Sequence, residues 1–371
     1  MRVMSQVAAV IAIACCANHA PAQPKATPVV DGTVKGEVAA KLDKRFAALA
    51  EKDFSGVVLV VKDDEVLLAK GYGFADRAGK VPYTTDTVFD IGSITKPFTA
   101  SAILRLEMDG KLKVTDPITK FFKDVPDDKK EITLHHLLTH TAGFKHSLGG
   151  DYDKISRDDF VKLALASKLR STPGTSYSYS NVGYSLLGAV IEQVTGGSYE
   201  KYLRDSLFEP AGMTKTGYVL PKWGKGELAR GYQKDKDWGT PLDRPWADDG
   251  PYWHLRANGG LLSTAGDLYR WSVALQGEGI LSKEAKAKQF APHASEGLLG
   301  GGNHYGYGWS IGKTRAGNRV WEHNGSNGVF FADFRIYPED RLVLILATNA
   351  TGLRYMSELS SVARALLPEK Q

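Results

Sequence analysis

The segment Ser93-Ile-Thr-Lys96 places a hydroxyl and an amine at a spacing that could activate a nucleophile. A serine hydroxyl is a weak nucleophile unless a base removes its proton. Positions i and i+3 are neighbours on one face of a helix, so Lys96 can reach Ser93 Oγ. The ring of Pro97 clashes with the Ser93 carbonyl four residues back, which predicts Ser93 at the very start of a helix. There the free N–H and the helix dipole favour an oxyanion. The alternative is a helix cap with a solvated lysine.

The segment Tyr179-Ser-Asn181 follows a turn at Pro173–Gly174 and could bring a phenol and an amide into the same cavity. Residues i and i+2 of an extended segment point the same way. Tyr179 could relay protons if neighbouring cations lowered its pKa. Asn181 could hold Lys96 and a substrate amide. The alternative is an ordinary surface loop.

A third segment, His323-Asn-Gly-Ser326, follows the apolar pair Val320–Trp321. Gly325 has no Cβ, so another stretch of backbone can approach it closely. A strand edge of this kind can pair with an extended substrate. The N–H of Ser326 is then a candidate second donor to an oxyanion. The alternative is a structural histidine in front of a turn.

Other residues that could bind a metal or a cofactor give weaker signals. Four histidines cluster in one stretch, at His135, His136, His140 and His146. His136 and His140 have the i, i+4 spacing of metal ligands on a helix, but the glutamate of a His-Glu-x-x-His site is missing. We therefore predict no metal. The sequence holds neither glycine-rich phosphate loop, so we also predict no nucleotide cofactor.

The elements that must position these segments differ between the ends and the middle of the chain. Apolar runs predict strands at residues 56–61, 66–69, 305–311, 319–323, 328–337 and 341–348. Helical periodicity or capping predicts helices at residues 37–51, 93–108, 158–169, 184–194, 265–276 and 353–367. We therefore predict an α/β (α+β) domain built from residues 37–113 and 255–371, with a helical domain over residues 114–254 inserted into it.

The N-terminus has the pattern of a secretory signal. Arg2 precedes an uncharged apolar run over residues 7–17, and small residues stand at Ala20 and Ala22. A run of eleven residues is too short to span a bilayer as a helix, whereas this pattern is typical of export. We expect cleavage after Ala22, a mobile leader over residues 23–36, and a periplasmic or secreted protein.

Charge and cysteine content narrow the class of protein further. Both cysteines, Cys15 and Cys16, lie in the signal segment, so the mature chain would have no disulfide. A lipoprotein anchored through one of them is the alternative. Removing residues 1–22 lowers the net charge from +5 to +4, and no basic run exceeds the pair Lys129–Lys130. Nucleic-acid binding requires a clustered basic face, and no later stretch has the 18 apolar residues of a membrane span.

Taken together and in order, the segments resemble the family of class C β-lactamases and D-alanyl-D-alanine carboxypeptidases. The likeness covers roughly residues 40–365 and is carried by the stretches 89–99, 132–143, 173–184, 259–264 and 305–309. It implies an α/β domain with an antiparallel sheet beside a helical domain, with the site in the cleft between them. By resemblance, Ser93 is the nucleophile, Lys96 and Tyr179 handle protons, Asn181 positions them, and the N–H groups of Ser93 and Ser326 bind the oxyanion.

One departure from the family pattern bears on the substrate. Many members carry Lys-Thr-Gly where this chain has His323-Asn324-Gly325. A histidine with an ordinary pKa near about 6.5 is mostly neutral at neutral pH, so a fixed cation for a substrate carboxylate is missing. We therefore expect an exported serine hydrolase for small esters, amides or peptides. The alternatives are a β-lactamase or D-Ala-D-Ala carboxypeptidase, and a non-catalytic peptidoglycan- or penicillin-binding protein.

Overall fold

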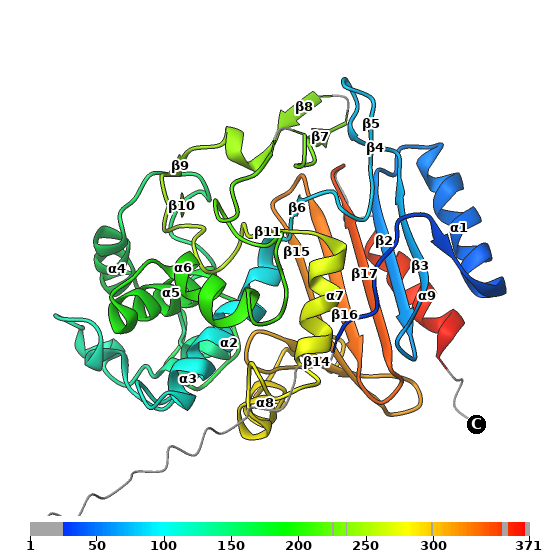
Figure 1. Cartoon of the computed structure of the whole chain (residues 1–371). Coiled ribbons are helices and arrows are strands. Elements are labelled where there is room, and N and C mark those ends of the chain that lie inside the picture. Colours follow the sequence, from blue (N-terminus) through cyan, green and yellow to red (C-terminus); the bar gives the residue numbers. More distant parts are fainter. Residues whose placement is uncertain (1–24, 225, 235, 298–299, 351–354, 368–371) are drawn as a thin grey trace, which may run out of the picture.

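The computed structural model describes residues 25–224, 226–234, 236–297, 300–350 and 355–367. A nine-stranded antiparallel sheet in the order β1-β3-β2-β17-β16-β15-β14-β13-β12 forms its centre (Figure 1). Its strands are β1 (Thr33–Val34), β2 (Gly56–Lys62), β3 (Glu65–Tyr72), β12 (Ala294–Ser295), β13 (His304–Tyr305), β14 (Ser310–Lys313), β15 (Arg319–Ser326), β16 (Phe331–Tyr337) and β17 (Leu342–Thr348). The prediction of an antiparallel sheet flanked by helices is confirmed.

Strands from both ends of the chain meet in this sheet. β2 pairs along its whole length with β17, beginning with Gly56 opposite Thr348. β2 and β3 form the expected hairpin, and Asp63 and Asp64 in its turn both have positive φ angles, of 51° and 63°. Two successive left-handed residues are typical of the type I′ turn that matches the twist of a hairpin.

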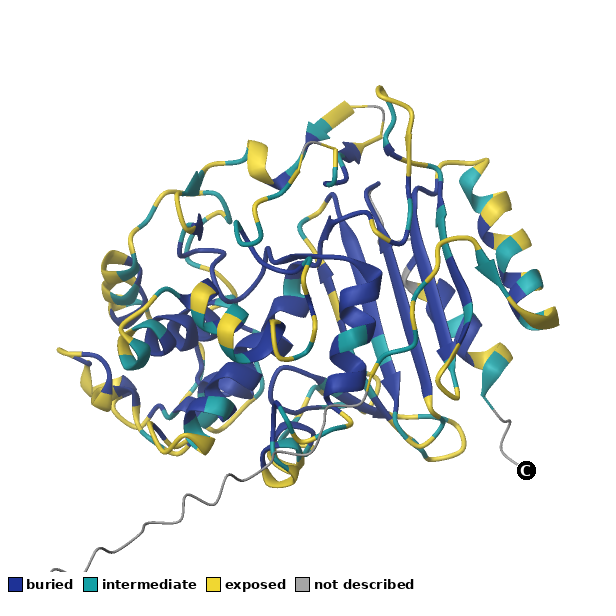
Figure 2. Ribbon diagram, viewed as in Figure 1, coloured by how far each residue is buried: buried dark blue, intermediate teal, exposed yellow. Residues whose placement is uncertain are grey.

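Helices cover both faces of the sheet (Figures 1 and 2). On one face, α1 (Gly36–Ala50) and α9 (Met356–Leu366) share a buried cluster with β2 and β17, in which Phe46 and Leu359 join Val58 and Leu344. α7 (Ala265–Ala274) packs against β2 and β17 from the other face. Because both faces are covered, β2 and β17 are continuous apolar runs without polar alternation.

The remaining helices gather mostly beside the sheet (Figure 1). They are α2 (Thr95–Met108), α3 (Leu134–Leu138), α4 (Arg157–Ala166), α5 (Asn181–Thr195), α6 (Tyr199–Leu203) and α8 (Lys283–Gln289). α2 contacts α5, α6 and α8 and is buried on nearly every side, which is why its sequence is not amphipathic. α2 packs against helices from both predicted domains, so this packing does not separate them. The division at residues 113 and 254 stays a prediction.

Short elements complete the framework. They are β4 (Phe74–Asp76), β5 (Val81–Pro82), β6 (Phe89–Asp90), β7 (Gly231–Gln233), β8 (Lys236–Gly239), β9 (Trp246–Ala247), β10 (Gly250–Pro251), β11 (Leu262–Ser263), the 3₁₀ turns η1 (Gly92–Ile94), η2 (Ile118–Lys120), η3 (Asp127–Lys129) and η5 (Pro241–Asp243), and the π-helical turn η4 (Arg204–Phe208). β6 pairs with β11 directly in front of η1. This pairing fixes the start of α2.

Within the described ranges, no helix combines the length and the apolar character needed to cross a membrane.

Several elements differ from the sequence-based expectations. Thr33 and Val34, inside the segment expected to be a leader, form the edge strand β1 and pair with β3. The single strand expected over residues 305–311 is instead a hairpin, because the chain reverses at a turn where Gly308 has a φ of +77°, and β13 pairs with β14. α5 begins at Asn181 and not at residue 184, because Ser180 caps it by accepting a hydrogen bond from Gly183 N–H. The expected signal over residues 1–22 lies outside the described residues.

Candidate active site

Ser93 and Lys96 lie at the junction of η1 and α2, and their side chains meet. Ser93 is in the 3₁₀ turn that precedes α2, so the position that Pro97 predicts for it is confirmed. Lys96 Nζ lies 3.0 Å from Ser93 Oγ, within hydrogen-bond distance. The pair therefore has the contact that a base and its nucleophile need.

The amine of Lys96 is completely buried, and three acceptors surround it. Besides Ser93 Oγ, Nζ contacts Asn181 Oδ1 at 2.9 Å and the carbonyl oxygen of Asn258 at 2.7 Å. Burial lowers the pKa of Lys96 well below its ordinary value, although the carboxylate of Asp151 acts in the opposite direction. In its neutral form, which this shift favours, the amine has two N–H bonds and one lone pair. The amide and carbonyl oxygens can only accept, so they take the two N–H bonds and leave the lone pair facing Ser93.

Tyr179 lies beside this pair. Its hydroxyl hydrogen-bonds with Ser93, and Lys96 Nζ is 4.7 Å from the centroid of its ring. The rings of His140 and His146 pack against Tyr179 at centroid distances of 4.3 and 5.8 Å. Burial raises the pKa of Tyr179 above its ordinary value, more than the hydrogen bond with Ser93 lowers it.

A pKa lowered by neighbouring cations, the condition for Tyr179 as a proton relay, is therefore not found. Burial disfavours the charged form of Lys96, and burial of Tyr179 outweighs what lowers its pKa. Tyr179 keeps its proton at neutral pH and can donate it. The extended geometry expected for the segment also differs, because Asn181 is the first residue of α5. Its amide nevertheless reaches Lys96, as the sequence predicted.

The end of β15 passes directly against η1, and glycine makes this approach possible. A Cβ on Gly325 would lie 1.9 Å from the Ile91 carbonyl oxygen and 2.6 Å from Ser93 N. A Cβ on Gly92 would lie 2.5 Å from Ser326 N. The close approach predicted for Gly325 is confirmed. The backbone nitrogens of Ser93 and Ser326 lie on two segments in contact, where an oxyanion hole needs its donors.

His323 is 7% exposed and both of its ring nitrogens are engaged. Nδ1 donates to the Asn324 carbonyl oxygen at 2.6 Å, and Nε2 accepts from the Tyr305 hydroxyl at 2.9 Å. The carbonyl oxygen can only accept, so Nδ1 carries a proton, and a neutral ring then accepts from Tyr305 at Nε2. Burial and the nearby Lys96 lower the pKa of His323 to about 3. The side chain is therefore an uncharged neighbour of Tyr179, with 6.3 Å between the ring centroids.

Neither Arg319 nor Arg315 takes the place of the missing cation near His323. Arg319 begins β15, about 13 Å of strand away from His323 at the usual rise per residue, and is paired with Glu339. Arg315 lines a groove beside α9 and is not in the lining of the cavity next to His323.

A cavity of about 320 Å³ opens beside Tyr179 and His323, and its charged groups leave it acidic. Glu296 lines it, and Glu296 Oε1 is buried without a hydrogen-bond partner among the described residues. The one guanidinium in the lining, Arg335, makes a bidentate pair with Asp333 and a second ion pair with Glu322 at 3.4 Å. Burial raises the pKa of Glu296 above its ordinary value.

Two groups near Lys96 had no sequence signal. The Asn258 carbonyl is a backbone group, so no residue type could mark it, although Asn258 directly precedes the stretch 259–264 that carries the family likeness. Asp151 lies on the loop between α3 and α4, within electrostatic reach of Lys96, His146 and His254. Burial raises the pKa of Asp151, and these three groups lower it.

The clustered histidines serve the protein framework. His136 Nδ1 accepts from Thr133 N–H in a capping box that starts α3, and His140 Nδ1 accepts from Ser180 N–H just before α5. In the described part of the chain, no three metal-binding side chains converge.

Comparisons with known proteins identify a matching family model and several similar chains. The family model described as beta-lactamase matches residues 42–366. The chain is 33% identical over 247 residues to the putative penicillin-binding protein PbpX of Bacillus subtilis, which covers 67% of this chain but only 61% of that protein. Among solved structures, the octameric penicillin-binding protein homologue from Pyrococcus abyssi has a TM-score of 0.74 at 29% identity, over 88% of this chain and 79% of its own. A D-amino acid amidase from Ochrobactrum anthropi SV3 has a TM-score of 0.75 over 89% and 97% of the two chains, and its 22% identity shows a shared fold alone.

Proposed function

Because this chain belongs to the beta-lactamase family of serine hydrolases, we propose that Ser93 attacks the carbonyl of small esters or amides and carries the acyl group until water removes it. The observation that carries the proposal is the environment of Lys96. The amine is completely buried, and two oxygens that can only accept lie on its N–H bonds. Its lone pair is left for Ser93 Oγ, so the amine is arranged as a base for that hydroxyl.

The steps follow from this geometry. Ser93 Oγ bonds to the substrate carbonyl carbon as its proton passes to Lys96, and the carbonyl oxygen takes the negative charge between the N–H groups of Ser93 and Ser326. The bond to the leaving group then breaks, and the leaving atom takes the proton of Tyr179. Lys96 returns its proton to Tyr179, which restores both groups. Water repeats the sequence on the acyl-enzyme and releases the acid.

The substrate preference rests on the charges beside Tyr179. The leaving group must lie within reach of the Tyr179 proton, so its substituents extend toward the acidic cavity. That cavity presents a neutral His323, the carboxylate of Glu296, and an Arg335 already paired with Asp333. A carboxylate on the leaving side meets no free cation among these lining groups. We therefore favour uncharged esters and amides, including amino-acid amides of the kind named for the D-amino acid amidase relative, over carboxylate-bearing β-lactams.

A parallel turnover screen tests the proposal. Purified protein is assayed with p-nitrophenyl acetate, D-Ala-p-nitroanilide and nitrocefin, beside the Ser93→Ala variant. We expect turnover of the acetate or the anilide at a higher kcat/KM than nitrocefin, and none in the variant. Nitrocefin as the best substrate would favour a β-lactamase, and binding of penicillin without turnover of any substrate would favour a non-catalytic binding protein.

We also propose that the enzyme works outside the cytoplasm, because its first 22 residues have the pattern of an export signal. Expressed from the full gene in a bacterial host, the mature protein should begin at Gln23. N-terminal sequencing of the periplasmic or secreted fraction checks this. An intact Met1 on cytoplasmic protein would contradict it, and a lipid-modified Cys15 or Cys16 would indicate a lipoprotein.

A further inference from the structure

The carbonyl of Asn258 is the nearest acceptor to Lys96 Nζ, and a short irregular segment presents it. The segment between β10 and β11 turns tightly, with Leu255 and Arg256 N–H both donating to the Tyr252 carbonyl. Asn258 is held within it, because its Nδ2 donates to the His254 carbonyl and to Ser185 Oγ, each at 2.8 Å. The direction of the Asn258 carbonyl therefore depends on the conformation of this turn.

The turn contains a residue that does not favour its own backbone conformation. Ala257 has a φ of +67°, in the left-handed region that side chains other than glycine rarely adopt. Such a conformation persists only where the surroundings hold it. Ala257 N–H donates to the Tyr218 hydroxyl at 3.0 Å, and its carbonyl accepts from Thr99 Oγ1 at 2.6 Å. The turn is thus pinned on its inner side by two hydroxyl groups.

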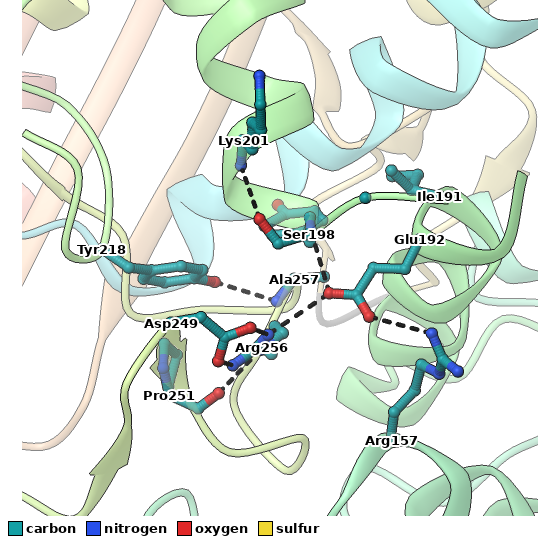
Figure 3. A network of polar contacts seen from close by, with 12 residues as sticks. Arg157, Ile191, Glu192, Ser198, Lys201, Tyr218, Asp249, Pro251, Arg256 and Ala257 are labelled. Carbon is teal, nitrogen blue, oxygen red and sulfur yellow. Dashed lines mark hydrogen bonds and ion pairs between the residues drawn. The ribbon is translucent and has the colours of Figure 1, made fainter. Parts of the chain in front are cut away.

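Arg256 pins the same turn on its outer side (Figure 3). Its guanidinium is 3% exposed and makes a bidentate pair with Asp249, with N–O distances of 2.7 and 2.6 Å. Its Nε donates to the Pro251 carbonyl at 2.9 Å, and its Nη1 is 3.4 Å from Glu192. Arg256 therefore ties the segment before the turn, through Asp249 and Pro251, to α5, which carries Glu192.

Two carboxylates, those of Asp249 and Glu192, face the Arg256 guanidinium, which makes its burial tolerable. Glu192 also pairs with Arg157 at 3.4 Å, and Arg157 pairs with Asp158. The network lies behind the turn and reaches Lys96 through the backbone of residues 256–258. A planar, five-donor guanidinium can hold three acceptors in fixed directions, which a lysine at the same position cannot do.

We propose that Arg256 is a positioning residue, which with Asp249 fixes the turn that keeps the Asn258 carbonyl on Lys96 Nζ. In this arrangement the carbonyl takes one N–H of the amine and helps to turn its lone pair toward Ser93. The turn also keeps water away from the amine. Loosening the outer pins would let the carbonyl rotate away and admit water. The proposal rests on the proposed role of Lys96 as the base for Ser93.

The test compares Asp249→Asn with a matched variant elsewhere. The Asp249 side chain is 53% exposed, so its replacement leaves the core intact. Asp237 is the control, because it forms a similar paired contact with Arg230 Nε and Nη2, is 43% exposed, and lies on β8, outside the turn. Asp237→Asn, Arg256→Lys and Ser93→Ala complete the set. Rates are expressed per active site titrated with a fluorophosphonate, and melting temperatures are recorded for each variant.

Asp249→Asn and Arg256→Lys should lower kcat/KM per titrated site by about tenfold or more, because small displacements of catalytic groups have large kinetic costs. The acid limb of the kcat/KM profile should also move to higher pH, because burial is the main cause that lowers the pKa of Lys96 and water would relieve it. Asp237→Asn should change neither quantity.

A lower melting temperature with an unchanged rate per site and an unchanged acid limb would overturn the proposal and leave Arg256 a purely structural role. An equal shift of the acid limb in Asp237→Asn would also overturn the proposal. Turnover in Ser93→Ala would instead contradict the proposed function itself, whatever the Asp249 variant does.

Discussion

Replacing His323 with lysine is expected to shift the enzyme from esters toward carboxylate-bearing β-lactams. The wild-type imidazole is neutral, because its pKa is lowered to about 3 and its two nitrogens are taken by Asn324 and Tyr305. A lysine at this position would place a cation beside Tyr179, at the edge of the cavity that receives the leaving side. There it could face a substrate carboxylate.

The size of the shift can be worked from the groups present. A charge-assisted hydrogen bond in a partly dry site is worth about 1.5–3 kcal/mol, which corresponds to roughly a tenfold to hundredfold change in kcat/KM. Glu296 lines the same cavity and would compete for the new cation. The single variant His323→Lys should therefore lie near the lower end, and the double variant His323→Lys with Glu296→Gln near the upper end.

The substitution also has a structural cost. The Tyr305 hydroxyl would lose its acceptor, His323 Nε2, and a buried hydroxyl without a partner costs about 1–3 kcal/mol of stability. A ratio of two substrates removes this effect, because both rates scale with the folded fraction. His323→Gln is the matched neutral control, since it removes the imidazole without adding charge.

The assay measures kcat/KM for nitrocefin and for p-nitrophenyl acetate in wild type, His323→Lys, His323→Gln and the double variant. The nitrocefin-to-acetate ratio should rise in both lysine variants and stay near the wild-type value in His323→Gln. A ratio unchanged by lysine, in a wild type that already prefers nitrocefin, would show that His323 does not set specificity and would put the β-lactamase alternative first.

Two further predictions concern the geometry and the protonation of the site. Gly325→Ala should lower kcat/KM by about a hundredfold or more, the usual effect of losing an oxyanion donor, because its Cβ would meet the Ile91 carbonyl oxygen at 1.9 Å; Gly197→Ala, where a Cβ has open space, is the control and should match wild type. The kcat/KM profile should fall as pH drops through the lowered pKa of Lys96, well below the ordinary lysine value of about 10.4. If the acid limb disappears in His323→Gln, the titrating group is His323 and not Lys96, and the prediction is contradicted.

Local sequence rules predicted the parts of the structure that local chemistry determines. The clash of Pro97 with the Ser93 carbonyl placed the nucleophile in front of α2, and the missing side chain of Gly325 predicted the close approach of β15. The β2–β3 hairpin followed from two apolar runs around Asp63 and Asp64. Each of these arguments uses residues within a few positions of one another.

Long-range features were beyond such rules. A lowered pKa of Tyr179 would need a neighbouring cation, but the packing of α2, α5 and the turn at Asn258 buries the Lys96 amine and disfavours its charge. A backbone carbonyl such as that of Asn258 has no identity in the sequence. Thr33 and Val34 lie in a stretch whose prolines and glycines indicate a leader, and their pairing depends on the edge of β3, far along the chain.

The most direct test of the account is to map where a fluorophosphonate probe attaches, and how fast. The account predicts one label, on the peptide that contains Ser93, with no labelling or turnover in Ser93→Ala and labelling slowed by about 100-fold or more in Lys96→Ala, the usual scale for losing a general base. A label on a different residue, or full activity in Ser93→Ala, would contradict the claim that Ser93 carries the acyl group and that Lys96 activates it.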